Sequence, residues 1–344
     1  MLNMRTPLRL SLAVGQKNTA QLLKDILNHE NIASLIASED LAREFIEFLR
    51  WPNGATCPHC QSVKVYSIAA NSAKKVRKGL YKCGDCKKQF TVTVGTIFED
   101  SRIPLNKWFH AMQLLTSSKK GSSSHQIHRT LGITYKSAWF LTHRIRYAMA
   151  EEMPEVKLSG VVEVDETYIG GKAKNMHAKV RKEKIQGRGA VNKEAVVTLV
   201  ERGGNVKTTH VAHVTGANLK EVMKKHIAKE AQIMTDESPS YSFVADEFAS
   251  HDSVNHGAGE YVRETAHVNT SESVHAIMKR GVIGVYHHWS EQHLHRYCAE
   301  FDFRFNRRKM TDGERLVEAF RKVEGKRLMY RQTKAKKEPQ EQID

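Results

Sequence analysis

The stretch that decides the fold is residues 161–169, VVEVDETYI, which is followed by the glycine pair Gly170-Gly171. Its apolar and polar residues alternate, and this is the period of a β-strand that turns one face toward a core. The alternation predicts that Val162 and Val164 face the core and that Glu163, Asp165 and Thr167 face away from it. The glycines are expected to end the strand.

The residues after this strand predict the rest of a sheet. The expected order is strand, strand, strand, helix, strand, which favours an α/β fold with a mixed sheet and helices on its faces. The first and fourth strands of such a sheet can lie side by side, so Asp165 and Asp236, which ends the fourth strand, are expected to converge. The further strands are expected at 195–201, 206–214 and 232–235, and the helix at 218–229.

A later helix is expected to begin near residues 269–271, with Glu272 in its first turn and Lys279 two turns further on the same face. Asp165, Asp236 and Glu272 together suit two divalent cations about 3.5–4 Å apart, which activate a hydroxyl nucleophile and stabilise the leaving oxygen at a phosphorus. Hard oxygen ligands favour Mg²⁺ or Mn²⁺ over zinc. Asn269 is an alternative third ligand through its amide oxygen. Competing carboxylates for these roles are Glu166, Glu237, Asp246 and Glu247.

Four of the five cysteines form two close pairs, Cys57-Pro-His-Cys60 and Cys83-Gly-Asp-Cys86. An odd number of cysteines without a clear secretory signal argues against a disulfide framework. Two CxxC turns separated by a hairpin-length segment are typical of a tetrahedral Cys₄ zinc site, so one structural Zn²⁺ per chain is expected. A pair of redox CxxC motifs is the alternative, but no βαβ pattern surrounds them.

Residues 105–150 predict three helices. The second, at 125–131, and the third are joined by the short turn Gly132-Ile133-Thr134, which is typical of a helix-turn-helix. An ordinary helical hairpin is the alternative. The third helix should bury the face that carries Ala138, Leu141 and Ile145. The basic side chains expected to contact DNA from it are Lys136, His143, Arg144 and Arg146.

The charge balance favours a polyanionic partner. The 344 residues include 54 Lys and Arg against 38 Asp and Glu, a net charge of +16. Nucleic acid is the usual partner of such an excess, and a merely solvated basic surface is the alternative. We find no apolar run near the roughly 18 residues that a membrane span needs, so a secreted or membrane protein is not expected. Further contacts with the DNA backbone are expected from Lys172, Lys174, Arg280, Arg307 and Arg308.

Several motifs together resemble the bacterial insertion-sequence DDE transposases that carry an N-terminal zinc ribbon. They are CPHC…YKCGDCKKQFTVTVGTIFEDSRIPLNKWF, LGITYKSAWFLTHRIR, VEVDETYIGGK, TDESPSY and HVNTSESVHAIMKRGVIGVYHHWSEQHLHRYCAEFDFRFNRR, within residues 38–310. The resemblance implies an RNase H-like core and a two-metal Asp/Asp/Glu site. It places the family's acids on Asp165, Asp236 and Glu272, with Asn269 as the amide variant and Lys279 as the basic companion. Beside Glu272 this chain has Ser271 and Val274-His275 where the family tends to have bulky apolar and aromatic residues.

The resemblance implies a Mg²⁺-dependent DNA transposase that binds the inverted-repeat ends of its element, cleaves the 3′ strands and joins them to target DNA. It is expected in the bacterial cytoplasm, associated with the nucleoid, and as a dimer or larger assembly on DNA. The alternatives are a catalytically inactive DNA-binding regulator and a structure-specific nuclease. The expected parts are an extension (1–37), a helix with the zinc ribbon (38–100), the helix-turn-helix (101–155), the catalytic domain (156–310) and a basic C-terminal tail (311–344).

Overall fold

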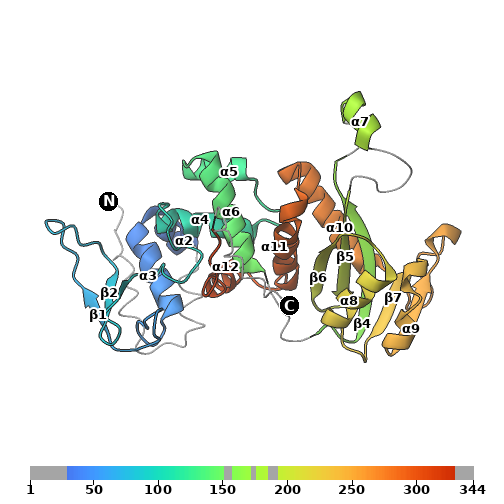
Figure 1. Ribbon diagram of the computed structural model, residues 1–344, viewed down its shortest axis with the longest axis horizontal. Helices are drawn as coiled ribbons and strands as arrows, with labels where there is room; N and C mark the ends of the chain where they lie inside the picture. The colour runs from blue at the N-terminus through green and yellow to red at the C-terminus, as the bar shows by residue number, and fades with distance from the viewer. Residues whose placement is uncertain (1–28, 151–156, 172–175, 185–192, 330–344) are drawn as a thin grey trace, which may run out of the picture. The chain divides into compact units, whose positions relative to one another are not determined.

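The computed structural model describes residues 29–150, 157–171, 176–184 and 193–329 (Figure 1). The chain divides into two compact units. The first unit comprises Met1–Phe109, Ile133–Ala148 and Phe320–Asp344, and the second comprises His110–Gly132 and Met149–Ala319. Residues 101–155, expected from the sequence as one domain, are divided between the two units. The domain limits expected from the sequence therefore stay predictions. No helix within the described ranges is long and apolar enough to cross a membrane.

The first unit begins with two helices and a small sheet. Helix α2 spans His29–Ala37 and α3 spans Glu39–Arg50. Ser38 caps α3, as its side chain accepts a hydrogen bond from the Leu41 backbone N–H, and Trp51 is the C-cap residue that follows the helix. The antiparallel sheet has the order β1-β2-β3. Its strands are β1 (Val65–Ile68), β2 (Leu80–Cys83) and β3 (Gln89–Phe90).

Aromatic side chains fill the core of the first unit. The Phe45 ring packs edge-on against Phe109 and Phe320, with ring centroids 5.4 and 5.6 Å apart. The unit boundary falls within α12 (Asp312–Arg321), which contains Phe320 and also buries Leu316 and Val317 in the part that belongs to the second unit. The chain from residue 311 therefore does not begin as a basic tail, because its apolar residues form a packed helical face. Residues 330–344 lie outside the described part.

Three consecutive helices follow the ribbon in the chain: α4 (Leu105–Ser117), α5 (Ser124–Leu131) and α6 (Tyr135–Met149). Ser123 caps α5 by accepting a hydrogen bond from the Gln126 backbone N–H, and the C-cap residue Gly132 takes the left-handed conformation, with φ of 59°. Glycine takes this conformation at no steric cost. The two helices and the short turn predicted from the sequence are therefore present, and α6 buries the predicted face.

The second unit is built on a five-stranded sheet of order β6-β5-β4-β7-β8. Its antiparallel part is β4 (Val161–Ile169), β5 (Glu194–Glu201) and β6 (Val206–Val211). Strands β7 (Gln232–Asp236) and β8 (Ser250–Val254) run parallel to β4. The neighbouring of the first and fourth strands is confirmed, and β8 is a fifth strand that the sequence reasoning did not include.

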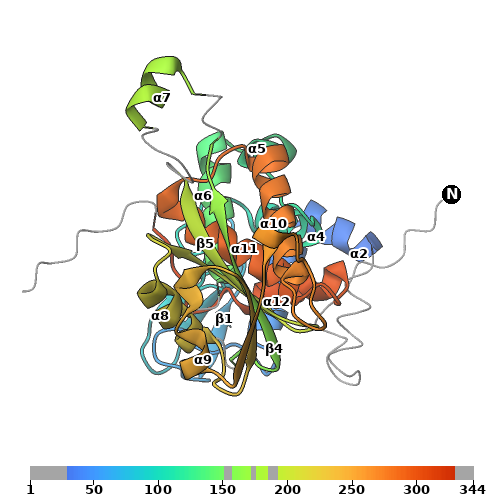
Figure 2. The ribbon, with the colours of Figure 1, turned by 90° about the vertical axis from the view of Figure 1, so that its right-hand side faces the viewer.

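Helices cover both faces of this sheet (Figure 2). Val162 and Val164 pack in one cluster with Leu219 of α8 (Gly216–His226). The other face packs against α10 (Asn269–Gly281) and α11 (Leu294–Asn306). This mixed sheet flanked by helices confirms the predicted α/β fold class. The remaining short elements are α7 (Ala178–Lys184), Pro239–Tyr241, α9 (Val244–Glu247), His256–Ala258, the π-helix Val282–Tyr286 and Glu291–His293.

One expectation about β4 is wrong. Glu163 and Thr167 were predicted to face away from the core, but both are buried, with exposed fractions of 0% and 2%. The alternation correctly separates the two faces of the strand. The alternation does not show that α10 covers the second face of the strand, because that contact joins residues about a hundred positions apart in the chain.

Candidate functional site

Asp165 and Asp236 meet where β4 and β7 lie side by side. The parallel register pairs Val161 with Gln232 and Glu163 with Met234, so its continuation places Asp165 beside Asp236. One carboxylate oxygen each from Asp165, Glu166 and Asp236 lies within 4.8 Å of the others. The predicted convergence of the two aspartates is therefore present, and Glu166 joins them.

Glu166 is the unusual member of this three-carboxylate group. Burial raises the pKa of Glu166 to about 7, although the Tyr241 hydroxyl donates a hydrogen bond to it and favours the charged form. The negative charges of Asp236 and Asp165 raise that pKa further. Burial and the adjacent Glu166 also raise the pKa of Tyr241 well above its usual value. The sequence offered Glu166 as a competitor of Asp165, and the carboxyl groups of both residues lie in the same cluster.

Hydrogen bonds from backbone N–H groups orient the two aspartates. Asp165 Oδ1 accepts a hydrogen bond from the Glu166 backbone N–H at 2.8 Å, and Asp236 Oδ1 accepts one from the Ser238 N–H at 3.0 Å. On α10, His275 Nδ1 lies 3.4 Å from Asp165 Oδ2. Its other ring nitrogen, Nε2, lies 2.8 Å from Thr198 Oγ1. His275 thus contacts a catalytic candidate directly.

The predicted third acid lies on the same helix as His275. Glu272 is exposed in the first turn of α10, and within the described residues it is not one of the three clustered carboxylates. Asn269 and Lys279 are exposed on α10 as well. Glu272 precedes His275 by about one helical turn, so it lies on the side of α10 that approaches Asp165. The assignment of Glu272 or Asn269 as third ligand stays a prediction.

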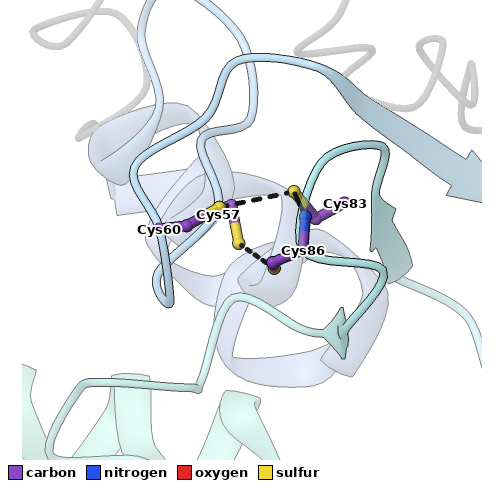
Figure 3. A group of neighbouring side chains, drawn as sticks. All are labelled: Cys57, Cys60, Cys83 and Cys86. Atoms are coloured by element: carbon purple, nitrogen blue, oxygen red, sulfur yellow. Dashed lines mark hydrogen bonds between the residues drawn. The ribbon is translucent and has the colours of Figure 1, made fainter.

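The four predicted zinc ligands converge in the first unit (Figure 3). Cys57 Sγ lies 3.6 Å from Cys86 Sγ, and Cys60 Sγ lies 3.6 Å from Cys83 Sγ. Four sulfurs at about 2.3 Å from a tetrahedral zinc are about 3.8 Å apart, so the observed spacing fits Zn²⁺. Each CxxC turn brings two thiols together. Strand β2 ends at Cys83, so the small sheet positions one of the four ligands.

The predicted DNA contacts differ in how far the structure exposes them. Lys136, Arg280 and Arg308 are exposed, whereas Arg307 is half-buried, with its guanidinium 4.3 Å from the centre of the Phe303 ring. Lys172 and Lys174 lie outside the described residues. The buried candidates on α6 are His143, Arg144 and Arg146, with exposed fractions of 0%, 4% and 0%.

Burial corrects the expectation that these three residues contact DNA. Arg144 donates a hydrogen bond to the Glu99 carbonyl, and its guanidinium lies 5.4 Å from the centre of the Trp108 ring. Arg146 donates to Thr142 Oγ1 at 3.2 Å. These basic side chains therefore make contacts inside the protein. The spacing of apolar residues on α6 does not reveal this, because residues 141–146 are buried without a break.

Comparisons with known proteins agree with this architecture. The ISXO2-like transposase domain matches residues 157–306, and the transposase zinc-ribbon domain matches residues 37–89. An uncharacterized protein in the transposable element ISH50 of Halobacterium salinarum is 30% identical over 275 residues, which cover 78% of this chain and 90% of that protein.

Two solved structures are more distant. A chain of a simian T-cell lymphotropic virus intasome in complex with PP2A regulatory subunit B56 gamma is 12% identical, with a TM-score of 0.27, over 59% of this chain and 66% of that one. A chain of a pre-cleavage Mos1 transpososome is 13% identical, with a TM-score of 0.23, over 62% and 77%. On its domain matches and its insertion-element relative, this chain belongs to the IS1595 family of insertion-sequence transposases, with a transposase zinc ribbon ahead of an ISXO2-like transposase domain.

Proposed function

We propose that this protein is a DNA transposase that cleaves the 3′ strands at the inverted-repeat ends of its element and joins them to target DNA. The observation that carries the proposal is the convergence of Asp165 and Asp236 on adjacent parallel strands. Clustered carboxylate oxygens are the donor set that Mg²⁺ or Mn²⁺ takes in proteins. Asp165 and Asp236 would hold two such ions together with a third ligand from α10.

The bound ions would lower the charge barrier to attack at phosphorus and stabilise the leaving oxygen. The protein's own part is to hold the ligands still: Ser238 and Glu166 backbone N–H groups orient the two aspartates. Glu272 supplies the third carboxylate, with Asn269 as its alternative. Lys279, two turns further along α10, holds the scissile phosphate backbone.

DNA is held by exposed basic side chains, among them Lys136, Arg280 and Arg308. Phosphate contacts provide affinity, and the α5–α6 helix-turn-helix provides sequence choice. Because two element ends must be joined, the active form is a dimer or larger assembly on DNA. Its place of action is the bacterial cytoplasm, on the nucleoid.

The test is strand transfer. Purified protein is mixed with Mg²⁺, a labelled duplex of the DNA flanking its own gene and a supercoiled plasmid. Wild type is compared with Asp165→Asn, Asp236→Asn and Glu272→Gln, and with Glu221→Gln, an exposed glutamate on α8, as the control.

We expect joined product from wild type and from the control, and none from the three site variants. Full activity of Glu272→Gln alone would assign Asn269 as the third ligand. Cleavage without joining would indicate a nuclease instead. End binding without cleavage would refute the catalytic proposal and indicate a regulator.

A further inference from the structure

A buried glutamate on the catalytic strand binds the first turn of α10. Glu163 lies two residues before Asp165 on β4 and has an exposed fraction of 0%. Its Oε2 accepts hydrogen bonds from the backbone N–H groups of Thr270 at 2.8 Å and Ser271 at 3.1 Å. Its Oε1 accepts one from Thr270 Oγ1 at 2.9 Å. The first backbone N–H groups of a helix have no partner inside the helix, so Glu163 satisfies donors that α10 cannot satisfy itself.

Helix α10 obtains this cap from a distant strand. Helices are usually capped by a Ser, Thr, Asp or Asn at the N-cap position. The N-cap residue of α10 is Val268, which makes no side-chain capping hydrogen bond. Glu163, which is 107 residues from Thr270 in the chain, takes that role. The cap therefore also joins α10 to β4.

Arg202, the residue after β5, completes the connection. Its Nε donates to Glu163 Oε1 at 2.7 Å. Its Nη1 and Nη2 donate to the backbone carbonyls of Thr265 at 2.7 Å and His267 at 2.9 Å. The same guanidinium thus compensates the buried charge of Glu163 and holds the segment that enters α10. A planar fork with several donors suits such a task, and a lysine cannot reproduce it.

We propose that Glu163 and Arg202 are positioning residues that fix the first turn of α10, with Asn269 and Glu272, against Asp165. The inference rests on the proposed function, since it concerns the third metal ligand. Glu163 and Asp165 lie on one face of β4, about 7 Å apart along the strand. Glu163 binds α10 at Thr270 and Ser271, and Asp165 contacts it at His275, so the helix is held at two points.

A glutamine at position 163 would break this arrangement while keeping its shape. Both carboxylate oxygens of Glu163 accept from donors: Oε2 from two backbone N–H groups, and Oε1 from Thr270 Oγ1 and Arg202. An amide has a single acceptor oxygen, so its NH₂ group would face donors on one side. The first turn of α10 would then lose either its cap or its link to Arg202.

The experiment measures Mn²⁺ binding to the full-length protein without DNA, by calorimetry and by electron paramagnetic resonance. Wild type, Asp165→Asn and Glu163→Gln are compared, and urea unfolding of each is measured alongside. The matched control is Asp302→Asn on α11. Asp302 is also buried and also joins a helix to a strand, because it accepts from the Thr208 backbone N–H at 3.0 Å and from Thr208 Oγ1 at 2.8 Å.

We expect both Glu163→Gln and Asp302→Asn to be less stable than wild type. Only Glu163→Gln should weaken Mn²⁺ binding, by about 10–100-fold, the usual effect of losing a residue that orients metal ligands. Should Glu163→Gln not fold, Arg202→Lys carries the same test: it keeps the charge and loses the two carbonyl contacts, and weaker Mn²⁺ binding is again expected.

Wild-type Mn²⁺ affinity in the folded Glu163 or Arg202 variant would overturn the inference, as would an equal loss in Asp302→Asn. Failure of the proposed function has a different signature: wild type would then bind no Mn²⁺, or Asp165→Asn would bind as well as wild type.

Discussion

Replacing Glu166 by glutamine should make the metal-free protein more stable at alkaline pH. Burial and two neighbouring carboxylates raise the pKa of this group from 4.5 to about 7. The folded state therefore binds more protons than the unfolded state between those values, and the stability contribution of Glu166 is lost as pH rises from 4.5 through 7. At about 1.4 kcal/mol per unit of pKa, the charged form costs the folded state about 3 kcal/mol above pH 7.

Glutamine removes this cost and keeps the local shape. Its Oε1 can still accept the hydrogen bond from the Tyr241 hydroxyl. We expect Glu166→Gln to exceed wild type in free energy of unfolding by up to about 3 kcal/mol at pH 8, and by little at pH 4.5.

The assay is urea unfolding at both pH values in buffer free of Mg²⁺ and Mn²⁺, without a chelator, so that the ribbon keeps its zinc. Circular dichroism and tryptophan fluorescence follow the transition. Glu221→Gln, on the exposed surface of α8, is the control and should change stability equally at both pH values. A difference between Glu166→Gln and wild type that is independent of pH would refute the reasoning.

Three further predictions concern other parts of the molecule. Cys60→Ser should bring bound zinc below one ion per chain by elemental analysis and unfold the β1-β2-β3 ribbon; retention of one tightly held zinc would contradict the Cys₄ assignment. Lys136→Gln should weaken DNA binding and reduce the slope of log affinity against log salt concentration by about one. Arg144→Gln should instead lower the melting temperature, because it breaks the hydrogen bond to the Glu99 carbonyl; a loss of DNA affinity from Arg144→Gln alone would reverse our division of the α6 side chains. Burial lowers the pKa of His226 to about 4, so the folded state binds fewer protons than the unfolded state and stability is lost as pH falls from 6.5 toward 4. His226→Gln should flatten this part of the profile of unfolding free energy against pH, measured by urea unfolding. An unchanged slope would argue against this role of His226.

The catalytic strand shows how far local pattern reaches. The alternation in residues 161–169 predicts the strand and the inward side of Val162 and Val164, because side-chain direction along a strand depends only on position. The order of elements predicts that β7 lies beside β4, and this suffices to bring Asp236 to Asp165. The spacing of the cysteines predicts the zinc cluster, because each CxxC turn is a local structure that brings two thiols together.

Other features depend on which distant segment covers a residue. Glu163 looks like a solvent-facing glutamate until α10 is placed over it, and Arg144 looks available to DNA until Glu99 and Trp108 surround it. The high pKa of Glu166 likewise requires its burial in the folded protein and the negative charges of Asp236 and Asp165 beside it. The sequence by itself determined the strands, the helix faces and the metal-binding residue types, since these follow from neighbours along the chain. Only the tertiary structure decided which charged side chains are buried as supports and which remain exposed, because burial depends on contacts between residues far apart in the chain.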